Sequence, residues 1–349
     1  MTLFIAAPDI HVGDAVGNHC LGIARAAERL GIPARAFAKH YTGDVEPLDT
    51  LFEQIQPQDT LLVSYSIHDP MLERLLALGN RKLCYFHGVT EPELLREFEP
   101  VTADLCARSL EQYPLLRQFD LVMANSRLTA ASLAPHLRAD EILVIPPVWP
   151  DMPLFRHVTA RRADRTGPLT LLVVGRVVPH KRVEDAIEIL AMVRESGVDA
   201  KLEIVGSAPN GVYLAFLRER AAQCGVADHV EITGMIDDES LFARFDRAGA
   251  MLSVSQHEGF CVPVLEAMHL GVPTFVRSGT AASEVGADAT VSFDRLEEAR
   301  TAILQMHRDP GRRAAMIEAG KRRAAAVLAQ ADDKALAAVL SVPRQANNF

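Results

Sequence analysis

Short apolar runs alternate along the first part of the chain with stretches whose apolar residues recur at helical spacing. Uninterrupted apolar runs are typical of buried parallel strands, and the stretches between them are typical of the helices that connect such strands. The predicted strands are Leu3–Ala7, Leu61–Ser66, Lys82–Phe86, Leu121–Ala124 and Glu141–Ile145. The predicted helices include Asn18–Leu30, Pro70–Leu78 and Arg127–Leu133. The pattern therefore predicts βαβ units around a mostly parallel sheet.

The alternation stops between Pro146 and Pro168 and then starts again. This stretch holds five prolines and the charged run Arg161–Arg165. Because proline fixes φ and removes a hydrogen-bond donor, we predict a linker here, with one long surface loop as the alternative. The strands predicted beyond it are Leu169–Val174, Lys201–Val205, Val230–Thr233, Ala250–Val254 and Thr274–Val276, and the helices are Val183–Ser196, Gly211–Cys224 and Cys261–Leu270.

This organisation predicts an α/β protein with two Rossmann-like, doubly wound domains. A chain of 349 residues is long for a single core. We expect an N-terminal domain over 1–150, a linker over 151–168 and a C-terminal domain over 169–330. Ligands of such sheets bind beyond the carboxyl ends of the strands, so two domains facing each other across a cleft would form a site there.

Composition narrows the class of protein and its partners. The net charge of −9 argues against nucleic acid as the main partner, because a phosphate backbone requires a basic surface. Five cysteines without paired spacing indicate reduced thiols, and neither a signal peptide nor a membrane-spanning run is recognisable. We expect a soluble, cytoplasmic protein. The basic residues between Arg312 and Arg323 favour a solvated helical face and leave open a weak peripheral association with the inner face of a membrane.

The stretch S-Q-H-E-G-F-C-V-P-V-L-E-A-M, residues 255–268, places two glutamates eight positions apart. Glu258 lies in the predicted loop after a strand, and Glu266 lies near the first turn of the predicted helix. Pro263 fits an early helical position, and Gly259 lets the backbone approach a ligand closely. Carboxylate acceptors beside backbone donors at a helix start suit a ligand covered in hydroxyl groups, such as a sugar. A solvent-facing helix residue and a loop charge are the alternative for either glutamate taken alone.

The run E-G-F-C-V-P-V-L-E-A-M-H-L-G-V-P resembles the E-x7-E signature of retaining glycosyltransferases with the GT-B fold, family 4. Gly175-Arg176 followed by Lys181 resembles the family's G-R-x-x-x-x-K stretch, and Leu202–Pro209 stands where members often have V-G-x-G-P. The resemblance is strong over Leu169–Asp294 and weaker in the first 150 residues. It identifies a family well and a substrate poorly.

The resemblance implies a role for each matching position. Glu266 would accept hydrogen bonds from the ribose of a nucleotide-sugar, and Glu258 would contact the transferred sugar. Arg176 and Lys181 would hold the diphosphate and neutralise the charge of the leaving group; surface ion pairs are the alternative for these cations. The implied donor site comprises Gly13, Gly17, Gly175, Arg176, Lys181, Gly206, Met235, Glu258, Gly259, Phe260, Cys261, Val262 and Glu266.

The first domain offers further candidates after two of its predicted strands. Gly13 and Gly17 lie in a loop that, in the family, approaches the phosphates, although a plain strand–helix turn fits equally well. Asp14 is a candidate to orient an acceptor hydroxyl. His87 follows a strand directly, and the resemblance implies that it contacts the donor sugar near the reacting carbon, with a capping role as the alternative. The implied catalytic residues are His87, Arg176, Lys181 and Glu258, and the implied acceptor contacts are Asp14 and His87.

No Asp-x-Asp stands at a predicted strand end, and Asp237 fits a helix N-cap instead. We therefore expect neither a metal nor a cofactor; a GDP- or UDP-hexose would be a substrate. The expected function is retaining transfer of a mannose- or glucose-type hexose to a saccharide or polyprenyl-linked acceptor in polysaccharide or glycoconjugate biosynthesis. The alternatives are a catalytically degenerate GT-B subunit, a GT-B epimerase or phosphorylase, and a two-domain solute-binding protein.

The end of the chain, 331–349, contains the alanine-rich helical stretch Lys334–Leu340. In the resembling fold the terminal helices often return to the first domain, so we expect this helix to pack there and to take part in closure.

Overall fold

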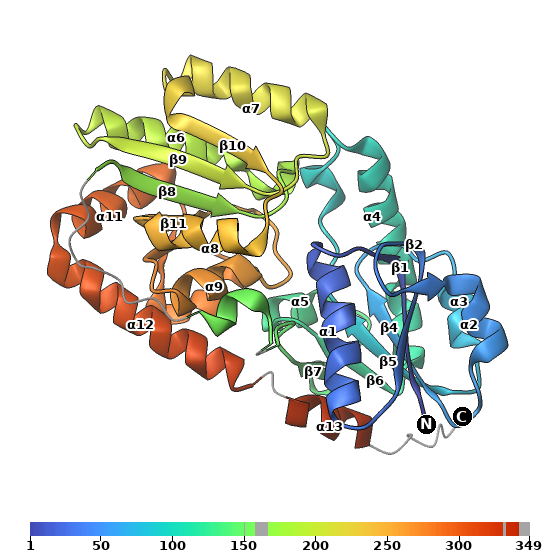
Figure 1. Ribbon diagram of the computed structural model, residues 1–349. Coiled ribbons are helices and arrows are strands. Elements are labelled where there is room, and N and C mark those ends of the chain that lie inside the picture. Colours follow the sequence, from blue (N-terminus) through green and yellow to red (C-terminus); the bar gives the residue numbers. More distant parts are fainter. Residues whose placement is uncertain (150, 158–166, 331–332, 342–349) are drawn as a thin grey trace. The chain divides into compact units, whose positions relative to one another are not determined.

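The computed structural model describes residues 1–149, 151–157, 167–330 and 333–341, and these residues form two compact units (Figure 1). The first unit contains the described residues of Met1–Glu91, Asp104–Pro150 and the chain from Leu328 onwards. The second contains those of Pro92–Ala103 and Asp151–Val327. Both are α/β units with a parallel sheet, so the predicted pair of Rossmann-like, doubly wound units is confirmed.

The first unit has a seven-stranded parallel sheet in the order β3-β2-β1-β4-β5-β6-β7. Its strands are β1 (Leu3–Ile10), β2 (Ala34–Tyr41), β3 (Glu46–Pro47), β4 (Thr60–Tyr65), β5 (Arg81–Phe86), β6 (Leu121–Ala124) and β7 (Ile142–Val144). Its helices are α1 (Ala15–Arg29), α2 (Leu48–Gln54), α3 (Leu72–Leu76), α5 (Arg127–Ser132), α13 (Asp333–Ser341) and the part of α4 (Pro100–Gln112) from Asp104 onwards.

The second unit has a six-stranded parallel sheet in the order β10-β9-β8-β11-β12-β13. Its strands are β8 (Leu169–Val174), β9 (Ala200–Val205), β10 (Val230–Gly234), β11 (Ala250–Ser253), β12 (Thr274–Arg277) and β13 (Val291–Phe293). Its helices are α6 (Val183–Glu195), α7 (Gly211–Gln223), α8 (Asp238–Arg247), α9 (Val262–His269), α10 (Ala281–Gly286), α11 (Leu296–Arg308) and α12 (Pro310–Leu328). Numbered within the unit, the strands run 3-2-1-4-5-6, so the order reverses between β8 and β11.

Helices cover both faces of this sheet, as a doubly wound unit requires. On one face α6, α7 and α11 share a continuous apolar cluster with the strands, which includes Ile187, Leu217 and Ile303. On the other face α8, α9 and α10 pack on β8, β11 and β12 (Figure 1). With both faces covered, the loops at the strand ends are where polar chemistry can gather.

The segment predicted as a linker has more structure than its prolines indicate. Residues 150 and 158–166 lie outside the described part of the chain, but Pro153–Arg156 form a 3₁₀ turn that buries Leu154 and Phe155. These two apolar side chains offset the poor backbone propensity around them. The N-cap prediction for Asp237 is confirmed, since its carboxylate accepts from the Ser240 amide over 2.8 Å. The five cysteines are free thiols.

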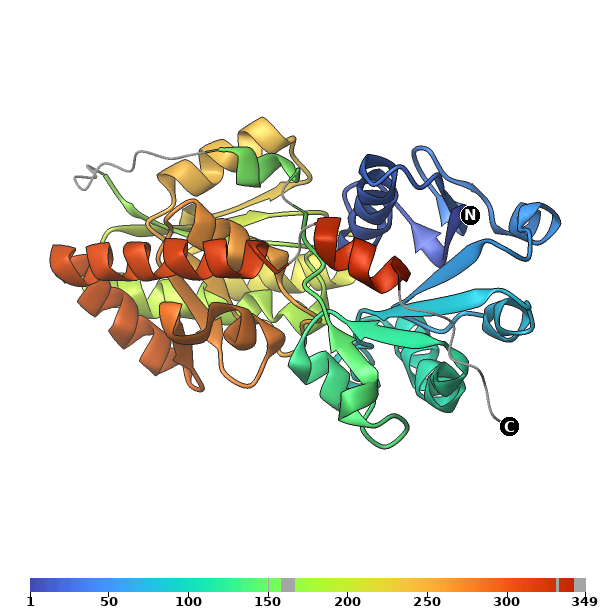
Figure 2. The ribbon, with the colours of Figure 1, turned by 90° about the horizontal axis from the view of Figure 1, so that it is seen from below.

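Helix α13 packs beside α1 within the first unit (Figures 1 and 2). Arg29 of α1 forms a two-pronged ion pair with Asp333, with both distances 2.7 Å. Arg81 donates to the carbonyls of Val339 and Leu340, also over 2.7 Å, and so caps the carboxyl end of the helix. Residues 331–332 and 342–349 of the predicted C-terminal segment lie outside the described residues.

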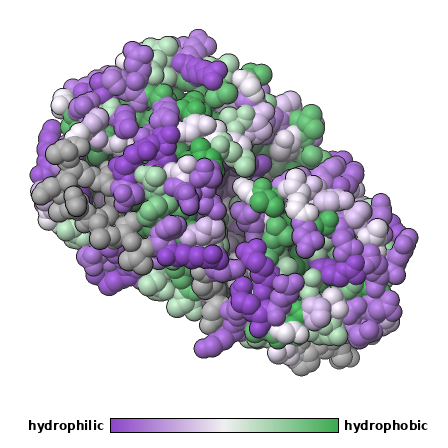
Figure 3. Space-filling model, viewed as in Figure 1, coloured by the Kyte–Doolittle hydropathy of each residue, from purple (hydrophilic) through white to green (hydrophobic). Residues whose placement is uncertain are grey.

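The surface in Figure 3 carries hydrophobic residues scattered among hydrophilic ones. Within the described ranges, no helix has the length and apolar character needed to cross a bilayer. The predicted solvated basic face on α12 is only partly correct. Arg323 donates to the carbonyls of Glu284 and Val285, and Arg313 donates to that of His307, so both side chains serve packing within the unit, while Arg312 and Arg322 are exposed.

Candidate active site

The candidate site of the second unit lies at the carboxyl ends of β8 and β11, where the strand order reverses. A small hollow there is lined by the loop after β8 and by the loop after β11. Its polar lining comes from Arg176 and Lys181 on one side and from Ser255, Glu258 and Cys261 on the other. Open α/β sheets bind ligands at this position, because loops on neighbouring strands diverge there.

Lys181 and Glu258 form a close ion pair at the centre of this hollow. The lysine Nζ lies 2.7 Å from Oε1 and 2.6 Å from Oε2 of the glutamate, which is 9% exposed. Ser255 Oγ donates to Oε1 over 2.7 Å, and the Cys261 thiol donates as well. Burial alone raises the pKa of Glu258, but the charge of Lys181 and these hydrogen bonds outweigh it and lower the pKa below its ordinary value.

This pairing bears on the roles expected for the two residues. The diphosphate partner, Lys181, and the sugar partner, Glu258, lie within one hydrogen bond of each other. A bound diphosphate would have to draw the ammonium group towards itself, and the carboxylate would then be free to accept from sugar hydroxyls. The pair keeps the Glu258 carboxylate ionised and holds both side chains in place before any ligand arrives.

Arg176 lies exposed at the start of the same loop, and within the described chain its guanidinium makes no hydrogen bond or ion pair. Gly175 before it has φ 141° and Gly206 has φ 144°, values that favour glycine. A Cβ on Gly206 would lie 2.0 Å from the Gly175 carbonyl oxygen, so the two loops meet backbone to backbone. Met235, directly after β10, is 67% exposed.

Glu266 is buried in α9, four residues after the helix begins and so slightly beyond the first turn that the sequence indicated. Burial, with a smaller contribution from the charge of Asp238, raises the pKa of Glu266 to about 8. No hydrogen bond to its carboxylate comes from any residue that the structure describes. A buried acceptor of this kind is suited to hydroxyl donors from a ligand.

The residues between the two glutamates shape the start of α9. Phe260 and Cys261 are buried, whereas Gly259 and Val262 are half-buried. Cys261 is the N-cap of the helix and adopts φ 76°, an uncommon conformation for a residue with a side chain. Such strain concentrates at functional sites, and here it directs the thiol towards Glu258.

In the first unit the candidates lie at the ends of β1 and β5. Gly13 has φ 89° and donates its amide to Asn18 Oδ1 over 3.0 Å. A Cβ on Gly17 would lie 2.1 Å from the His11 carbonyl oxygen, so α1 starts in close contact with the loop before it. Asp14 is the N-cap residue of α1, but its side chain makes no capping hydrogen bond.

His87 is buried directly after β5, and its Nε2 lies 2.8 Å from Ser64 Oγ. Its ring contacts those of His19 and Tyr85. Burial lowers the pKa of His87 to about 3, so the imidazole is neutral. Within the described part of the first unit no hydrogen bond or ion pair joins Asp14 to His87.

Sequence reasoning missed two residues that support the site. Arg277 ends β12 and donates to the Val254 carbonyl, and Asp185 in the first turn of α6 accepts from it. A charged residue directly after an apolar strand is the signal that could have drawn attention to Arg277. The sequence contains no comparable signal for Asp185, because an acidic residue in a first helical turn is ordinary.

Comparisons with known proteins show which families and folds this chain is similar to. Residues 159–323 match the family model described as glycosyl transferases group 1. Over 222 residues the chain is 31% identical to the GDP-mannose-dependent alpha-(1-6)-phosphatidylinositol monomannoside mannosyltransferase of Mycobacterium tuberculosis. This match covers 58% of this chain and 56% of the relative. The chain is also 29% identical over 140 residues to the GDP-mannose:cellobiosyl-diphosphopolyprenol alpha-mannosyltransferase of Komagataeibacter xylinus. That match covers 36% of this chain and 35% of the relative. The chain thus spans about half the length of the Mycobacterium tuberculosis relative and about a third of the length of the Komagataeibacter xylinus relative.

Among solved structures, the chain is similar to WaaG, a glycosyltransferase involved in lipopolysaccharide biosynthesis, with a TM-score of 0.74. The match has 15% sequence identity and covers 98% of this chain and 100% of that one. The fold is therefore GT-B. The family model matches the second unit, which contains the candidate site.

Proposed function

We propose that this protein transfers a mannosyl group from GDP-mannose to a hydroxyl of a saccharide or lipid-linked saccharide, with retention of the anomeric configuration. The observation that carries the proposal is the pairing of Lys181 with Glu258 at the switch point of the second unit. A nucleotide-sugar presents a diphosphate beside sugar hydroxyls, and this site offers a cation beside a carboxylate. The names of the two mannosyltransferase relatives favour GDP-mannose over other nucleotide-hexoses.

In the proposed complex Arg176 and Lys181 hold the diphosphate, and Glu258 accepts from hydroxyls of the transferred sugar. Glu266 accepts from the ribose once it is ionised. The remaining donor contacts are proposed to be backbone contacts and close packing at Gly175, Gly206, Met235, Gly259, Phe260, Cys261 and Val262. In the first unit we propose Gly13 and Gly17 for the phosphates and Asp14 and His87 for the acceptor and the reacting sugar.

The proposed reaction breaks the bond between the anomeric carbon and the phosphate oxygen and forms a bond from that carbon to the acceptor oxygen. The acceptor attacks on the face from which the phosphate leaves, and the departing phosphate takes the acceptor proton. Negative charge grows on the phosphate as the bond breaks, so fixed cations stabilise the transition state more than the ground state. Because Arg176 and Lys181 supply that charge, we propose no metal or cofactor, and EDTA should leave the rate unchanged.

Calorimetry with GDP, UDP, ADP and CMP in metal-free buffer tests the donor site. We expect GDP to bind most tightly, and Glu266→Ala to weaken it about tenfold or more, which corresponds to about 1.4 kcal/mol. Consumption of GDP-mannose with a saccharide acceptor, followed by NMR of the anomeric proton of the product, then tests transfer and retention. Tight binding of GDP without any transfer would favour the degenerate subunit, and binding of none of the four would contradict the site.

A further inference from the structure

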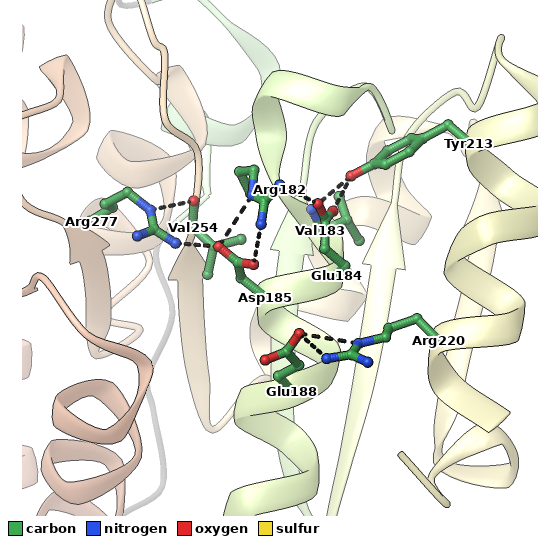
Figure 4. Close-up of polar contacts among 9 residues, drawn as sticks. All are labelled: Arg182, Val183, Glu184, Asp185, Glu188, Tyr213, Arg220, Val254 and Arg277. Atoms are coloured by element: carbon green, nitrogen blue, oxygen red, sulfur yellow. Dashed lines mark hydrogen bonds and ion pairs between the residues drawn. The ribbon is translucent and has the colours of Figure 1, made fainter. Parts of the chain in front are cut away.

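A network of charged side chains lies at the amino-terminal end of α6 (Figure 4). Asp185 accepts hydrogen bonds from two guanidinium groups, that of Arg182 over 3.0 Å and that of Arg277. Arg277 also donates through Nε to the Val254 carbonyl over 2.8 Å. Asp185 is 6% exposed and the Arg277 side chain is 17% exposed, so the pair is largely withdrawn from water.

Each end of this network is adjacent in sequence to a residue of the candidate site. Arg182 directly follows Lys181. Val254 directly precedes Ser255, whose hydroxyl donates to Glu258. The two loops also meet directly, because the Gln256 amide donates to the His180 carbonyl over 2.9 Å. The loop after β11 is therefore connected to the loop after β8 at both neighbours of Ser255. The connection is direct at Gln256 and runs through Arg277 and Asp185 at Val254.

The turn that carries Lys181 depends on this network for its shape. Arg182 adopts a left-handed conformation with φ 52°, which is uncommon for a residue with a side chain, and no side chain caps α6 at this position. Its guanidinium is held by Glu184 over 2.8 Å and by Asp185. Tyr213 accepts from the Val183 amide over 3.1 Å and hydrogen-bonds to Glu184. Side chains thus supply the restraint that a helix cap would otherwise give.

We infer that Arg277 is a positioning residue, which fixes the separation of Lys181 and Glu258 by joining Asp185 to the Val254 carbonyl. The inference rests on the proposed function, in which that separation sets how the diphosphate and the sugar are held. Arg277 touches neither member of the ion pair and acts through the two loops that carry them.

An arginine is suited to this role because its planar guanidinium directs several donors at once. Here Nε reaches a carbonyl and a terminal nitrogen reaches a carboxylate, so one rigid group spans both acceptors. A lysine keeps the charge, but its single ammonium on a flexible stem cannot hold the same two acceptors in a fixed geometry. Arg277→Lys therefore keeps the positive charge but removes the fixed geometry of the guanidinium.

The test is the affinity for GDP of Arg277→Lys, measured by calorimetry alone and combined with Lys181→Met. We expect Arg277→Lys to weaken GDP binding about tenfold in the natural background. In the Lys181→Met background the same change should have less than about a twofold effect, because the group that Arg277 positions is gone. An equal loss in both backgrounds would indicate a general structural role and would overturn the inference.

The chain offers a matched control in the same view. Arg220 of α7 pairs with Glu188 of α6 over 2.5 Å, away from the strand ends (Figure 4). Arg220→Gln removes a guanidinium–carboxylate link to the same helix, and it should change GDP affinity by less than about twofold. A loss as large as that of Arg277→Lys would also overturn the inference.

A crystal structure of ligand-free Arg277→Lys separates this inference from the proposed function. If Arg277 positions the pair, Lys181 Nζ should lie more than about 4 Å from the Glu258 carboxylate, beyond ion-pair range. If the pair keeps its present distances, the inference fails even when GDP binds. If the natural protein binds no nucleoside diphosphate, the proposed function fails, and the crystal structure still decides whether Arg277 positions the pair. Should Arg277→Lys not fold, Asp185→Ala removes the same link from its other end.

Discussion

In each unit a side-chain contact joins the fourth and fifth strands, counted along the chain. The contact is neutral in the first unit and charged in the second. In the first unit His87, directly after β5, meets Ser64 of β4, and both groups are neutral. In the second unit Arg277, at the end of β12, meets the carbonyl after β11 and the buried carboxylate of Asp185. One topology thus supports a neutral link and a charged link at equivalent places.

The neighbouring turn explains the difference. In the second unit the turn after β8 brings Lys181, Arg182 and Asp185 to the strand ends, and each of these three charges has a partner of opposite sign. In the first unit the corresponding turn after β1 offers Gly13 and Asp14, and neither reaches His87 through a hydrogen bond or ion pair among the described residues. A buried charge without a partner is costly, so the histidine stays neutral. We infer that ion pairs with a ligand's diphosphate come from the second unit, and that His87 of the first unit offers a neutral hydrogen bond.

The largest effect should follow the loss of the central cation. Lys181→Met leaves the Glu258 carboxylate buried beside hydrogen-bond donors but without a positive charge. We expect transfer to fall about 100-fold or more, as when a preorganised electrostatic contact is removed. The free energy of unfolding should fall by about 3 kcal/mol, because half of a buried ion pair remains. Steady-state kinetics and urea unfolding measure the two effects.

Lys201→Met is the control for this substitution. Lys201 Nζ pairs with the fully buried Glu203 over 2.8 Å in the same unit, but Arg244 and Arg247 also bind that carboxylate. Its loss leaves no unpaired charge, so transfer should change by less than about twofold. Equal losses of activity in Lys181→Met and Lys201→Met would break the assignment of ionic contacts to the candidate site.

A smaller effect should appear in the pH dependence of GDP binding, through Glu266. Its pKa is about 8, and we expect only the carboxylate to accept from both ribose hydroxyls. The ionised fraction of Glu266 rises about tenfold between pH 7 and pH 9, so the affinity for GDP should rise by about the same factor, with release of a proton on binding. Calorimetry in buffers of different ionisation enthalpy measures both. Glu266→Gln should remove the pH dependence, and its persistence in that variant would assign it to another group.

The free energy of unfolding should fall as pH rises, whereas the affinity for GDP should increase. The folded state keeps a proton on Glu266 that the unfolded chain loses above about pH 4.5. Stability should therefore decrease as pH rises from about 4.5 to about 8 and change no further through this group. Glu266→Gln should flatten that slope, which urea unfolding at several pH values would detect.

The sequence predicted the sheets better than it predicted the site. β6 and β8 were predicted with their observed bounds, because both are short apolar runs buried on two faces. β2 was missed because its final residues, from Lys39 on, are exposed and interrupt the apolar pattern. Arg277 and Asp185 could not be paired from the sequence, since 92 positions separate them and only the folded unit brings the end of β12 to the first turn of α6. Glu258 was named from the pattern of residues 255–268 and Lys181 from a resemblance, but their direct contact was not foreseen.

The smallest effect should come from His87. With a pKa of about 3 it carries no charge at neutral pH, so it can supply a ligand with one neutral hydrogen bond at most. His87→Gln keeps a group able to hydrogen-bond Ser64, and it should reduce kcat/KM by no more than about fivefold, the value of about 1 kcal/mol. If His87 stays neutral, the pH profile of kcat/KM for the natural protein should have no inflection near pH 6.5 that is lost in His87→Gln. Such an inflection would mean that His87 does ionise during the reaction, and the contrast between a neutral first unit and a charged second unit would then fail at the residue on which it depends most.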